Sequence, residues 1–270
     1  MNLCVDPDGA FLLFIGIPRS GHSIVGAIID AHPNAIVSHE LNVLSLLSEE
    51  DAEQTRIFNS ILENSKRQAS QGRSQSHEDH GPNFELNKSA NLEQYKFDYS
   101  IPNQFQGEWK DRLLVIGDKK GGGTTKLLGE NIQLYKLLEE TVNLPIKTII
   151  VIRNPFDNIA TMAYRSGNPV LSQIEAYKKY IQTITSLMDE LELDAQLIFH
   201  EDFVKDSKST IKKLLKWLKL PADEKFLADT SEIVNNKPNK SRTRVKWEQS
   251  EKNKVNQLIS KYEILEPYLE

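Results

Sequence analysis

The sequence predicts an α/β protein in which helices cover both faces of a parallel β-sheet, giving three layers. Short apolar runs that suit buried strands alternate along the chain with longer stretches of helical periodicity. The run over residues 146–152, IKTIIVI, is largely β-branched and apolar, as expected of a central parallel strand covered on both sides. A glycine-containing loop follows the first strand and opens the first helix. The 270 residues are ample for one large core of this class.

The first three predicted elements lie within residues 11–40. A buried strand is expected over the apolar run 11–15. A helix is expected over 22–31, where the apolar residues fall on one broad face. Pro33 ends that helix, because proline disfavours the helical conformation in the residue before it. A short second strand then ends at Glu40.

The loop between this strand and this helix is predicted to bind a phosphate group. Gly16, Gly21 and Ser23 have the spacing of a phosphate loop. The helix that follows offers unpaired backbone N–H groups and a partial positive charge at its N-terminus. His22 stands where a nucleotide triphosphatase has its lysine, and Arg19 is the basic residue instead, with a guanidinium that can hold oxyanions bidentately. The alternative is a plain strand–turn–helix connection with an exposed arginine.

The rest of the chain continues the alternation of strands and helices. Further strands are expected over residues 112–117, 146–152 and 196–199. Further helices are expected over residues 48–65, 126–140, 170–193, 207–218 and 249–262, with another beginning near Asp157. The sequence shows no internal repeat and no linker between domains, so residues 1–270 are expected to form a single domain.

Two groups of cationic residues lie at the ends of expected strands. Lys119 and Lys120 follow one strand, at the edge where open α/β sheets place their ligands. Arg153 closes the strand IKTIIVI, and Thr161 and Arg165 share one face of the helix that follows. These three donors predict a second anion site. For both groups the alternative is solvated side chains on the surface.

Charge and cysteine content narrow the classes of partner and compartment. The net charge of −5 and the pI of about 5.8 favour neither nucleic acid nor an anionic membrane as a partner, although residues 237–246 are locally basic. The single cysteine, Cys4, excludes an intramolecular disulfide and fits a reducing compartment. No apolar run approaches the roughly 20 residues that span a bilayer, and the N-terminus lacks the basic region of a signal peptide. We therefore expect a cytoplasmic protein.

Residues 66–91 are predicted to form a mobile polar insert within the domain. They are rich in Ser, Gln, Asn, Gly and charge, so they cannot bury enough apolar surface to order themselves. Such an insert is either a lid over a substrate or an idle loop. Its run His77-Glu78-Asp79-His80 contains metal-ligating residue types, but metal ligands need a rigid surrounding shell, which favours a solvated loop. We expect no bound metal.

Taken in order, these motifs resemble the sulfotransferase family that uses 3′-phosphoadenosine 5′-phosphosulfate (PAPS). Residues 16–23 resemble its 5′-phosphosulfate loop, and residues 153–161 resemble its 3′-phosphate motif, with threonine at the usual serine. Residues 198–204 resemble its later strand motif, and residues 214–221 the helix and leucine–proline turn behind it. The most similar pattern is that of tyrosylprotein sulfotransferases and related bacterial domains. The resemblance covers most of the chain outside residues 48–99.

The resemblance implies a P-loop-type fold and roles for individual residues. Glu40 lies at the family's offset from Arg19 for the general base, and His39 is the rival base because histidine titrates nearer neutrality. Lys119 resembles the lysine that stabilises the transferring sulfuryl group, although Lys120-Gly121 stands where the family has Asp-Pro. The residues implied in donor binding are Pro18, Arg19, Ser20, Gly21, His22 and Ser23 around the 5′ end, and Arg153, Thr161 and Arg165 around the 3′-phosphate.

The implied reaction is sulfuryl transfer from PAPS to a hydroxyl or amine acceptor without a metal. A small molecule or a carbohydrate is the favoured acceptor, and a peptide stays open. One alternative is a P-loop nucleotide kinase or triphosphatase, which the histidine at His22 disfavours. Another alternative is a non-catalytic nucleotide-binding protein. The presence of Arg19, Glu40 and Arg153 in one chain argues against it. His200 falls where many family members carry a tyrosine near the nucleotide.

Overall fold

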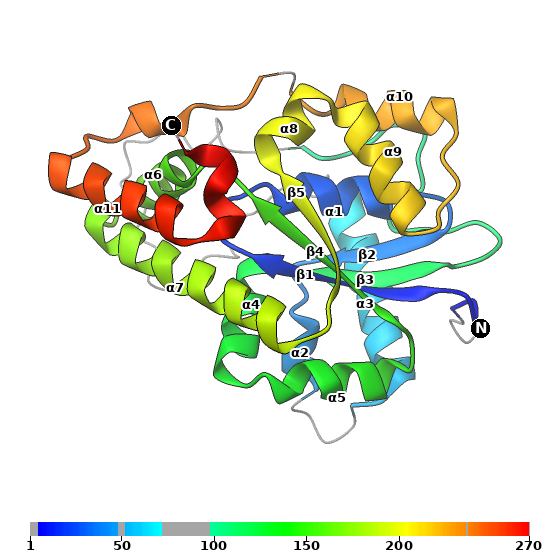
Figure 1. The fold of residues 1–270 in the computed structure, drawn as a ribbon. Helices are drawn as coiled ribbons and strands as arrows, with labels where there is room; N and C mark the ends of the chain where they lie inside the picture. Colours follow the sequence, from blue (N-terminus) through cyan, green and yellow to red (C-terminus); the bar gives the residue numbers. More distant parts are fainter. Residues whose placement is uncertain (1–4, 48–51, 72–97, 236, 270) are drawn as a thin grey trace.

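Five stretches of the sequence form parallel strands and pair into one sheet (Figure 1). The strands are β1 (Ala10–Gly16), β2 (Ala35–His39), β3 (Val115–Lys119), β4 (Ile146–Ile152) and β5 (Asp194–Phe199). Their order across the sheet is β2-β3-β1-β4-β5. This computed structural model describes residues 5–47, 52–71, 98–235 and 237–269. The predicted parallel α/β architecture is confirmed.

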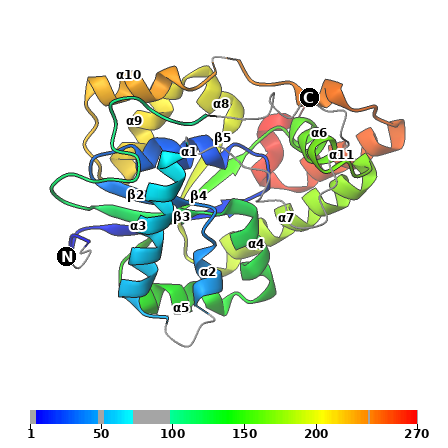
Figure 2. The ribbon, with the colours of Figure 1, turned by 180° about the vertical axis from the view of Figure 1, so that it is seen from behind.

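Helices cover both faces of the sheet, as Figure 1 and Figure 2 show from opposite sides. The helices are α1 (His22–Asp30), α2 (Val43–Leu46), α3 (Gln54–Ser70), α4 (Gly121–Glu130), α5 (Gln133–Val142), α6 (Pro155–Ser166), α7 (Val170–Glu190), α8 (His200–Lys205), α9 (Ser207–Trp217), α10 (Glu224–Glu232) and α11 (Gln249–Lys261), with the 3-10 helices η3 (Ser241–Arg244) and η4 (Glu263–Tyr268). Apolar residues of α1, α8, α9 and α10 pack on one face, and those of α3, α4, α5, α7 and α11 on the other. The fold therefore has the three predicted layers.

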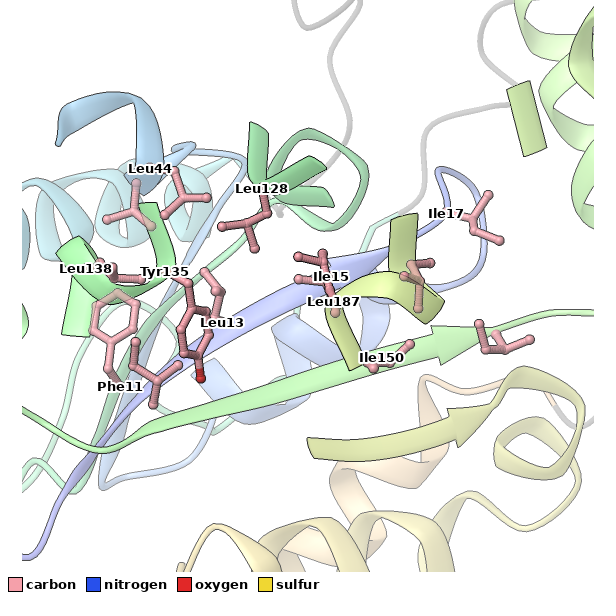
Figure 3. Packing of buried hydrophobic residues seen from close by; sticks show 14 of the residues in the cluster. Phe11, Leu13, Ile15, Ile17, Leu44, Leu128, Tyr135, Leu138, Ile150 and Leu187 are labelled. Carbon is pink, nitrogen blue, oxygen red and sulfur yellow. The ribbon is translucent and has the colours of Figure 1, made fainter. Parts of the chain in front are cut away.

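The two cores are supplied by alternate residues of the same strands. In β1, Phe11, Leu13 and Ile15 belong to one core, part of which Figure 3 shows. Leu12 and Phe14 belong to the other. Successive side chains of a strand point to opposite faces, so an apolar strand between two helical layers is buried on both sides. Each such side chain stabilises the fold by about 1.5–3 kcal/mol when fully buried.

All five strands are parallel, so their carboxyl ends lie along one edge of the sheet. The loop after β1 lies at this edge, and so do Glu40 after β2 and Lys119 at the end of β3. Arg153 follows β4 and His200 follows β5. Open parallel sheets bind their ligands at this edge. The topology therefore brings together residues that are far apart in the sequence.

One expected helix is two helices in the structure. The prediction of a continuous helix over residues 126–140 was wrong, because Asn131 is extended, with φ −151° and ψ 96°, between α4 and α5. The Asn131 side chain accepts a hydrogen bond from the Gln133 N–H at 3.1 Å. Such local bonds compete with helix continuation. In addition, α4 begins earlier than expected, so that the three glycines from Gly121 form its first turn.

Helix α3 corrects the predicted start of the polar insert. It begins at Gln54 and runs to Ser70, so residues 66–70 are helical and not part of a loop. Polar side chains on its inner face explain this: Ser65 donates a hydrogen bond to Asp30 at 2.7 Å, and Asn64 donates to the His39 carbonyl at 3.0 Å. Because these buried residues are polar, the sequence of this helix resembles that of an exposed segment. Residues 72–91 of the predicted insert lie outside the described residues.

Three further α-helices of the described chain, α2, α8 and α10, were not expected. Helix α8 follows β5 directly, and α10 begins after Asp223, whose carboxylate accepts a hydrogen bond from the Phe226 N–H at 2.7 Å. No helix in the described ranges is long and apolar enough to cross a membrane. The described ranges also hold no cluster of three or more residues of the metal-binding types. The run His77–His80 lies outside them.

Candidate active site

A cleft with a volume of about 600 Å³ opens at the carboxyl edge of the sheet. Of the residues proposed from the sequence, its lining includes Pro18, Arg19, Gly21, His22, Ser23, Glu40, Lys119, Arg153, Thr161 and Arg165. Ser20 is the exception: it is buried within the loop, where its Oγ lies 2.9 Å from the Ile17 carbonyl oxygen. The structure thus places nearly all of the predicted site residues around one space.

The loop after β1 needs glycine at Gly21. This residue has a φ of 110°, and a Cβ there would lie 2.6 Å from Nδ1 of His200. Arg19 also adopts a positive φ, 70°. Gly21 is the N-cap of α1 and provides no side-chain hydrogen bond to the helix. The partial positive charge of the helix N-terminus therefore faces the cleft, as expected of a loop that binds an anion.

His22 supports this loop from inside. Its Nε2 lies 3.2 Å from the Ile15 carbonyl oxygen, which can only accept, so Nε2 carries the proton. Its Nδ1 lies 3.0 Å from Ser20 Oγ. Burial, together with the nearby Lys119 charge, lowers the pKa of His22 to about 4. The ring is therefore neutral near pH 7 and does not replace the cationic lysine of a nucleotide triphosphatase.

Glu40 and Lys119 form an ion pair between the ends of β2 and β3. The Lys119 side chain is only 1% exposed, and its Nζ donates to Glu40 Oε1 and, at 3.2 Å, to Ser23 Oγ. Lys120 Nζ lies 2.9 Å from the other Glu40 oxygen. Burial alone would raise the pKa of Glu40, but the two ammonium groups outweigh burial and hold that pKa well below its ordinary value. Burial lowers the pKa of Lys119, which the Glu40 charge opposes.

The structure separates Glu40 from its rival His39. The Glu40 side chain is 24% exposed and belongs to the cleft lining. His39 is buried, and the described lining of the cleft does not include it. Its Nε2 lies 3.5 Å from Lys119 Nζ, on the inner side of the ion pair. An acceptor in the cleft would therefore meet the Glu40 carboxylate first.

Arg153 lies at the end of β4, where a second group of donors converges. It is 7% exposed, and its guanidinium donates to Thr161 Oγ1 at 3.1 Å and to the Arg19 carbonyl at 3.3 Å. Burial lowers the pKa of Arg153, and the nearby Asp157 carboxylate opposes that shift. Arg165 lines the same cleft one helical turn beyond Thr161. The structure brings these residues together at one end of the cleft.

The C-terminal segment completes this part of the site, a feature that the sequence did not predict. Arg153 donates to the Asn239 carbonyl at 2.8 Å and to Ser241 Oγ at 3.0 Å. Arg242 fastens the segment to α6 through Asp157, with its Nη2 2.9 Å from Oδ2. The basic composition of residues 237–246 was the available signal. The sequence alone does not show which strand end this segment reaches.

His200 and two apolar stretches line the rest of the cleft. His200 Nδ1 is buried and has no hydrogen-bond partner among the described residues. Burial lowers the pKa of His200 to about 4, with Arg153 acting in the same direction. Phe203 and Val204 of α8 and Ile233 and Val234 after α10 add apolar surface. The cleft therefore has cationic ends and an apolar wall.

Comparison with known proteins identifies the family of this chain. A sequence model described as the sulfotransferase family matches residues 12–224. The chain belongs to the sulfotransferase family. No curated protein matches the chain by sequence.

Two solved sulfotransferase structures have the same fold. The sulfotransferase domain from the Synechococcus PCC 7002 olefin synthase is 14% identical, with a TM-score of 0.52 over 100% of this chain and 98% of that chain. A sulfotransferase from Alicyclobacillus acidocaldarius is 13% identical, with a TM-score of 0.51 over 97% of this chain and 95% of that chain. At these identities the likeness concerns the fold alone. The family match does not favour the kinase alternative.

Proposed function

We propose that this protein transfers a sulfuryl group from PAPS to a hydroxyl or amine acceptor, with Glu40 as the general base. The observation that carries the proposal is one cleft that joins three features. These are the glycine-containing loop with Arg19, the Arg153 cluster and, at the strand ends, the Glu40–Lys119 pair. Family membership supports the reaction class.

The residues present suit a nucleotide with phosphate groups at both ends. The α1 N-terminus and Arg19 would hold the 5′ end of the donor, and Arg153, Thr161 and Arg165 would hold the 3′-phosphate. Buried polar atoms without hydrogen-bond partners among the described residues, Nε of Arg153 and Nδ1 of His200, fit a missing polar ligand. The apolar wall from α8 suits a purine base. PAPS, when bound, supplies the sulfuryl group on an activated anhydride.

Glu40 would accept the proton of the acceptor hydroxyl as the new O–S bond forms and the bond from sulfur to the bridging oxygen breaks. The products are the sulfated acceptor and 3′-phosphoadenosine 5′-phosphate. A positioned general base typically contributes about 10²–10⁴-fold to the rate. Lys119 would offset negative charge on the transferring group, as cations do in phosphoryl transfer. As Lys119 turns from the Glu40 carboxylate toward that charge, Glu40 regains basicity. No step needs a metal.

The acceptor would enter beside Glu40, where Lys120 also lines the cleft. A small molecule or a carbohydrate alcohol suits this space, and a peptide stays open. The net charge of −5 gives no reason to propose a nucleic-acid partner. We keep a cytoplasmic location as a proposal on the sequence grounds already given.

Calorimetric titration with 3′-phosphoadenosine 5′-phosphate tests the donor site. The wild type should bind without Mg²⁺, and Arg153→Ala should weaken binding roughly 10- to 100-fold, because it removes charge-assisted hydrogen bonds. Glu40→Ala should keep the affinity, because Glu40 would act on the acceptor. Arg112→Ala is the matched control, since Arg112 pairs with Asp6 on an exposed surface and does not line the cleft.

A wild type that binds neither this nucleotide nor PAPS would overturn the proposed function. ATP binding that requires Mg²⁺ would instead favour a kinase. Equal losses in Arg153→Ala and Arg112→Ala would show that the Arg153 cluster is not the nucleotide site.

A further inference from the structure

Asp118 is a buried carboxylate that the proposed reaction does not use directly. It precedes Lys119 on β3, is 0% exposed and does not belong to the described lining of the cleft. Its Oδ1 accepts from Ser38 Oγ at 2.6 Å and from the Leu41 N–H at 3.1 Å. Its Oδ2 accepts from the Asn42 N–H at 2.7 Å and from the Val43 N–H at 3.0 Å. One carboxylate thus accepts four hydrogen bonds and holds the backbone turn that directly follows β2.

That turn has an unusual conformation. Glu40 and Asn42 both have positive φ values, 62° and 68°. A residue other than glycine in the left-handed region costs about 1–2 kcal/mol. The Glu40 N–H still bonds to the Lys119 carbonyl at 3.0 Å, so the chain leaves the sheet only after this point. Something must hold the two strained residues, and the hydrogen bonds to Asp118 do so.

We propose that Asp118 is the positioning residue for Glu40: its carboxylate fixes the turn over residues 40–43 so that the Glu40 side chain meets Lys119 in the cleft. The inference rests on the proposed function, because it concerns the base of that reaction. Asp118 does not belong to the described lining of the cleft, and it holds the backbone that carries Glu40. Its negative charge also acts directly on Glu40 and Lys119.

The chemistry of the contacts requires a carboxylate at this position. All four partners are donors, and an ionised carboxylate offers only acceptors. An amide would turn its NH₂ group toward at least one N–H of the turn and leave that group buried and unsatisfied. Burial raises the pKa of Asp118, and the hydrogen bonds from Ser38 and Val43 oppose that rise.

Asp30 supplies a matched control. It too is 0% exposed, and it accepts from the Val37 N–H at 2.6 Å, from Ser65 Oγ at 2.7 Å and from the Gly107 N–H at 2.9 Å. It lies at the end of α1, and these three hydrogen bonds come from outside the turn over residues 40–43. Asp30→Asn should therefore lower the free energy of unfolding much as Asp118→Asn does, while leaving Glu40 in place.

The experiment is an NMR titration of the full chain labelled with ¹³C at the glutamate carboxyl carbon. The Glu40 signal is assigned by its loss in Glu40→Gln. In the wild type and in Asp30→Asn, we expect the Glu40 pKa to lie well below the ordinary glutamate value, as the lysine contacts require. In Asp118→Asn it should move up toward that value, because the Glu40 carboxylate leaves the lysines. Loss of the Asp118 charge alone would lower the Glu40 pKa, so a rise reports the movement of the turn. Binding of 3′-phosphoadenosine 5′-phosphate should stay within about threefold, since the Arg153 cluster is independent of the turn.

Ser38→Ala keeps the experiment decisive if Asp118→Asn does not fold. It removes one donor and retains the carboxylate, so the Glu40 pKa should shift in the same direction by less. An unchanged Glu40 pKa in a folded Asp118→Asn variant overturns the inference. If Asp118→Asn does not fold, an unchanged Glu40 pKa in Ser38→Ala overturns it instead. Failure of the wild type to bind nucleotide overturns the proposed function alone, because the Glu40 titration does not depend on a ligand.

Discussion

The protonation state of Glu40 depends on the two ammonium groups that touch it. Lys119 is buried beneath the carboxylate, and Lys120 approaches from the more exposed side. Lys120 occupies the position where the family resemblance expects aspartate, so this second contact is a feature of the present chain. A general base must be ionised to accept a proton, so activity is lost when the pH falls below its pKa. The lysines thus extend the pH range of Glu40 downward.

Replacing Lys120 with methionine should raise the pKa of Glu40 toward its ordinary value. In the proposed transfer from PAPS, the variant should then lose activity at a higher pH than the wild type, whose acid limb should lie below the ordinary glutamate range. Lys126→Met is the control, because Lys126 is exposed on α4 and pairs only weakly with Glu130, at 3.9 Å. Superimposable profiles for wild type and Lys120→Met would show that Lys120 does not influence the base.

Sequence patterns predicted which residues belong to the site better than they predicted the contacts between those residues. Arg19, Glu40 and Arg153 follow strands and Lys119 ends one, so alternation and the family resemblance were enough to single them out. The contact between Glu40 and the lysines depends on β2 lying beside β3, with His39 opposite Lys119. Strand order is a property of long-range pairing, which spacing along one chain does not encode. For the same reason the four bonds to Asp118 were not predicted.

At the level of elements, the loop after β1 depends on the absence of a side chain at Gly21. An alanine there would force a Cβ into a left-handed backbone and against His200 Nδ1, 2.6 Å away. Gly21→Ala should lower the free energy of unfolding by about 1–2 kcal/mol from backbone strain. Because the loop must shift to admit the methyl group, binding of 3′-phosphoadenosine 5′-phosphate should weaken as well.

Gly167→Ala separates these two effects. Gly167 ends α6 with a φ of 71°, and a Cβ there meets nothing within 4 Å. It should lose a similar amount of stability in denaturant unfolding and keep its nucleotide affinity in calorimetry. If Gly21→Ala also kept its affinity, the loop would not be the binding element.

The helices divide according to how much their sequence reveals. Helices with an apolar stripe, such as α1, α7 and α9, lie close to their predicted ranges. Helix α3 extends further than predicted because its inner face carries Asn64, Ser65 and Gln68, which are buried yet polar. Their partners, among them Asp30, come from elsewhere in the chain. The capping aspartate of α10, Asp223, is a sequence signal that could have predicted this helix. The sequence offered no comparable signal for the break at Asn131.

At the scale of the whole molecule, segments that lie far apart in the sequence come together to close the site. The Arg242–Asp157 contact ties the C-terminal segment to α6, and Tyr268 in η4 donates to Glu201 in α8 at 2.6 Å. Composition and alternation predicted the three-layer sheet because they report average burial. They did not predict that the C-terminal segment crosses the carboxyl edge, because its polar residues carry no periodic signal. Stability and site integrity are therefore coupled.

The buried histidines His22 and His32 and the partly buried His200 make this coupling sensitive to pH. Burial lowers the pKa values of His22, His32 and His200 below the ordinary value of 6.5, and those of His22 and His200 to about 4. A depressed pKa in the folded state means that the unfolded chain binds protons first as the pH falls. The stability contribution is complete above pH 6.5 and is lost progressively toward pH 4.

His22 alone should account for about 2 kcal/mol of stability lost between pH 7 and pH 5. His22→Gln should be less stable at pH 7, because it alters the contacts to Ile15 and Ser20, but its stability should fall less on acidification. Free energies of unfolding from guanidinium titrations at pH 7, 6 and 5, at constant ionic strength, measure both slopes. All other titrating groups are common to the two proteins, so the difference in slope isolates His22. Equal slopes would mean that His22 has the same pKa in the folded and the unfolded protein, so that burial does not hold the ring neutral.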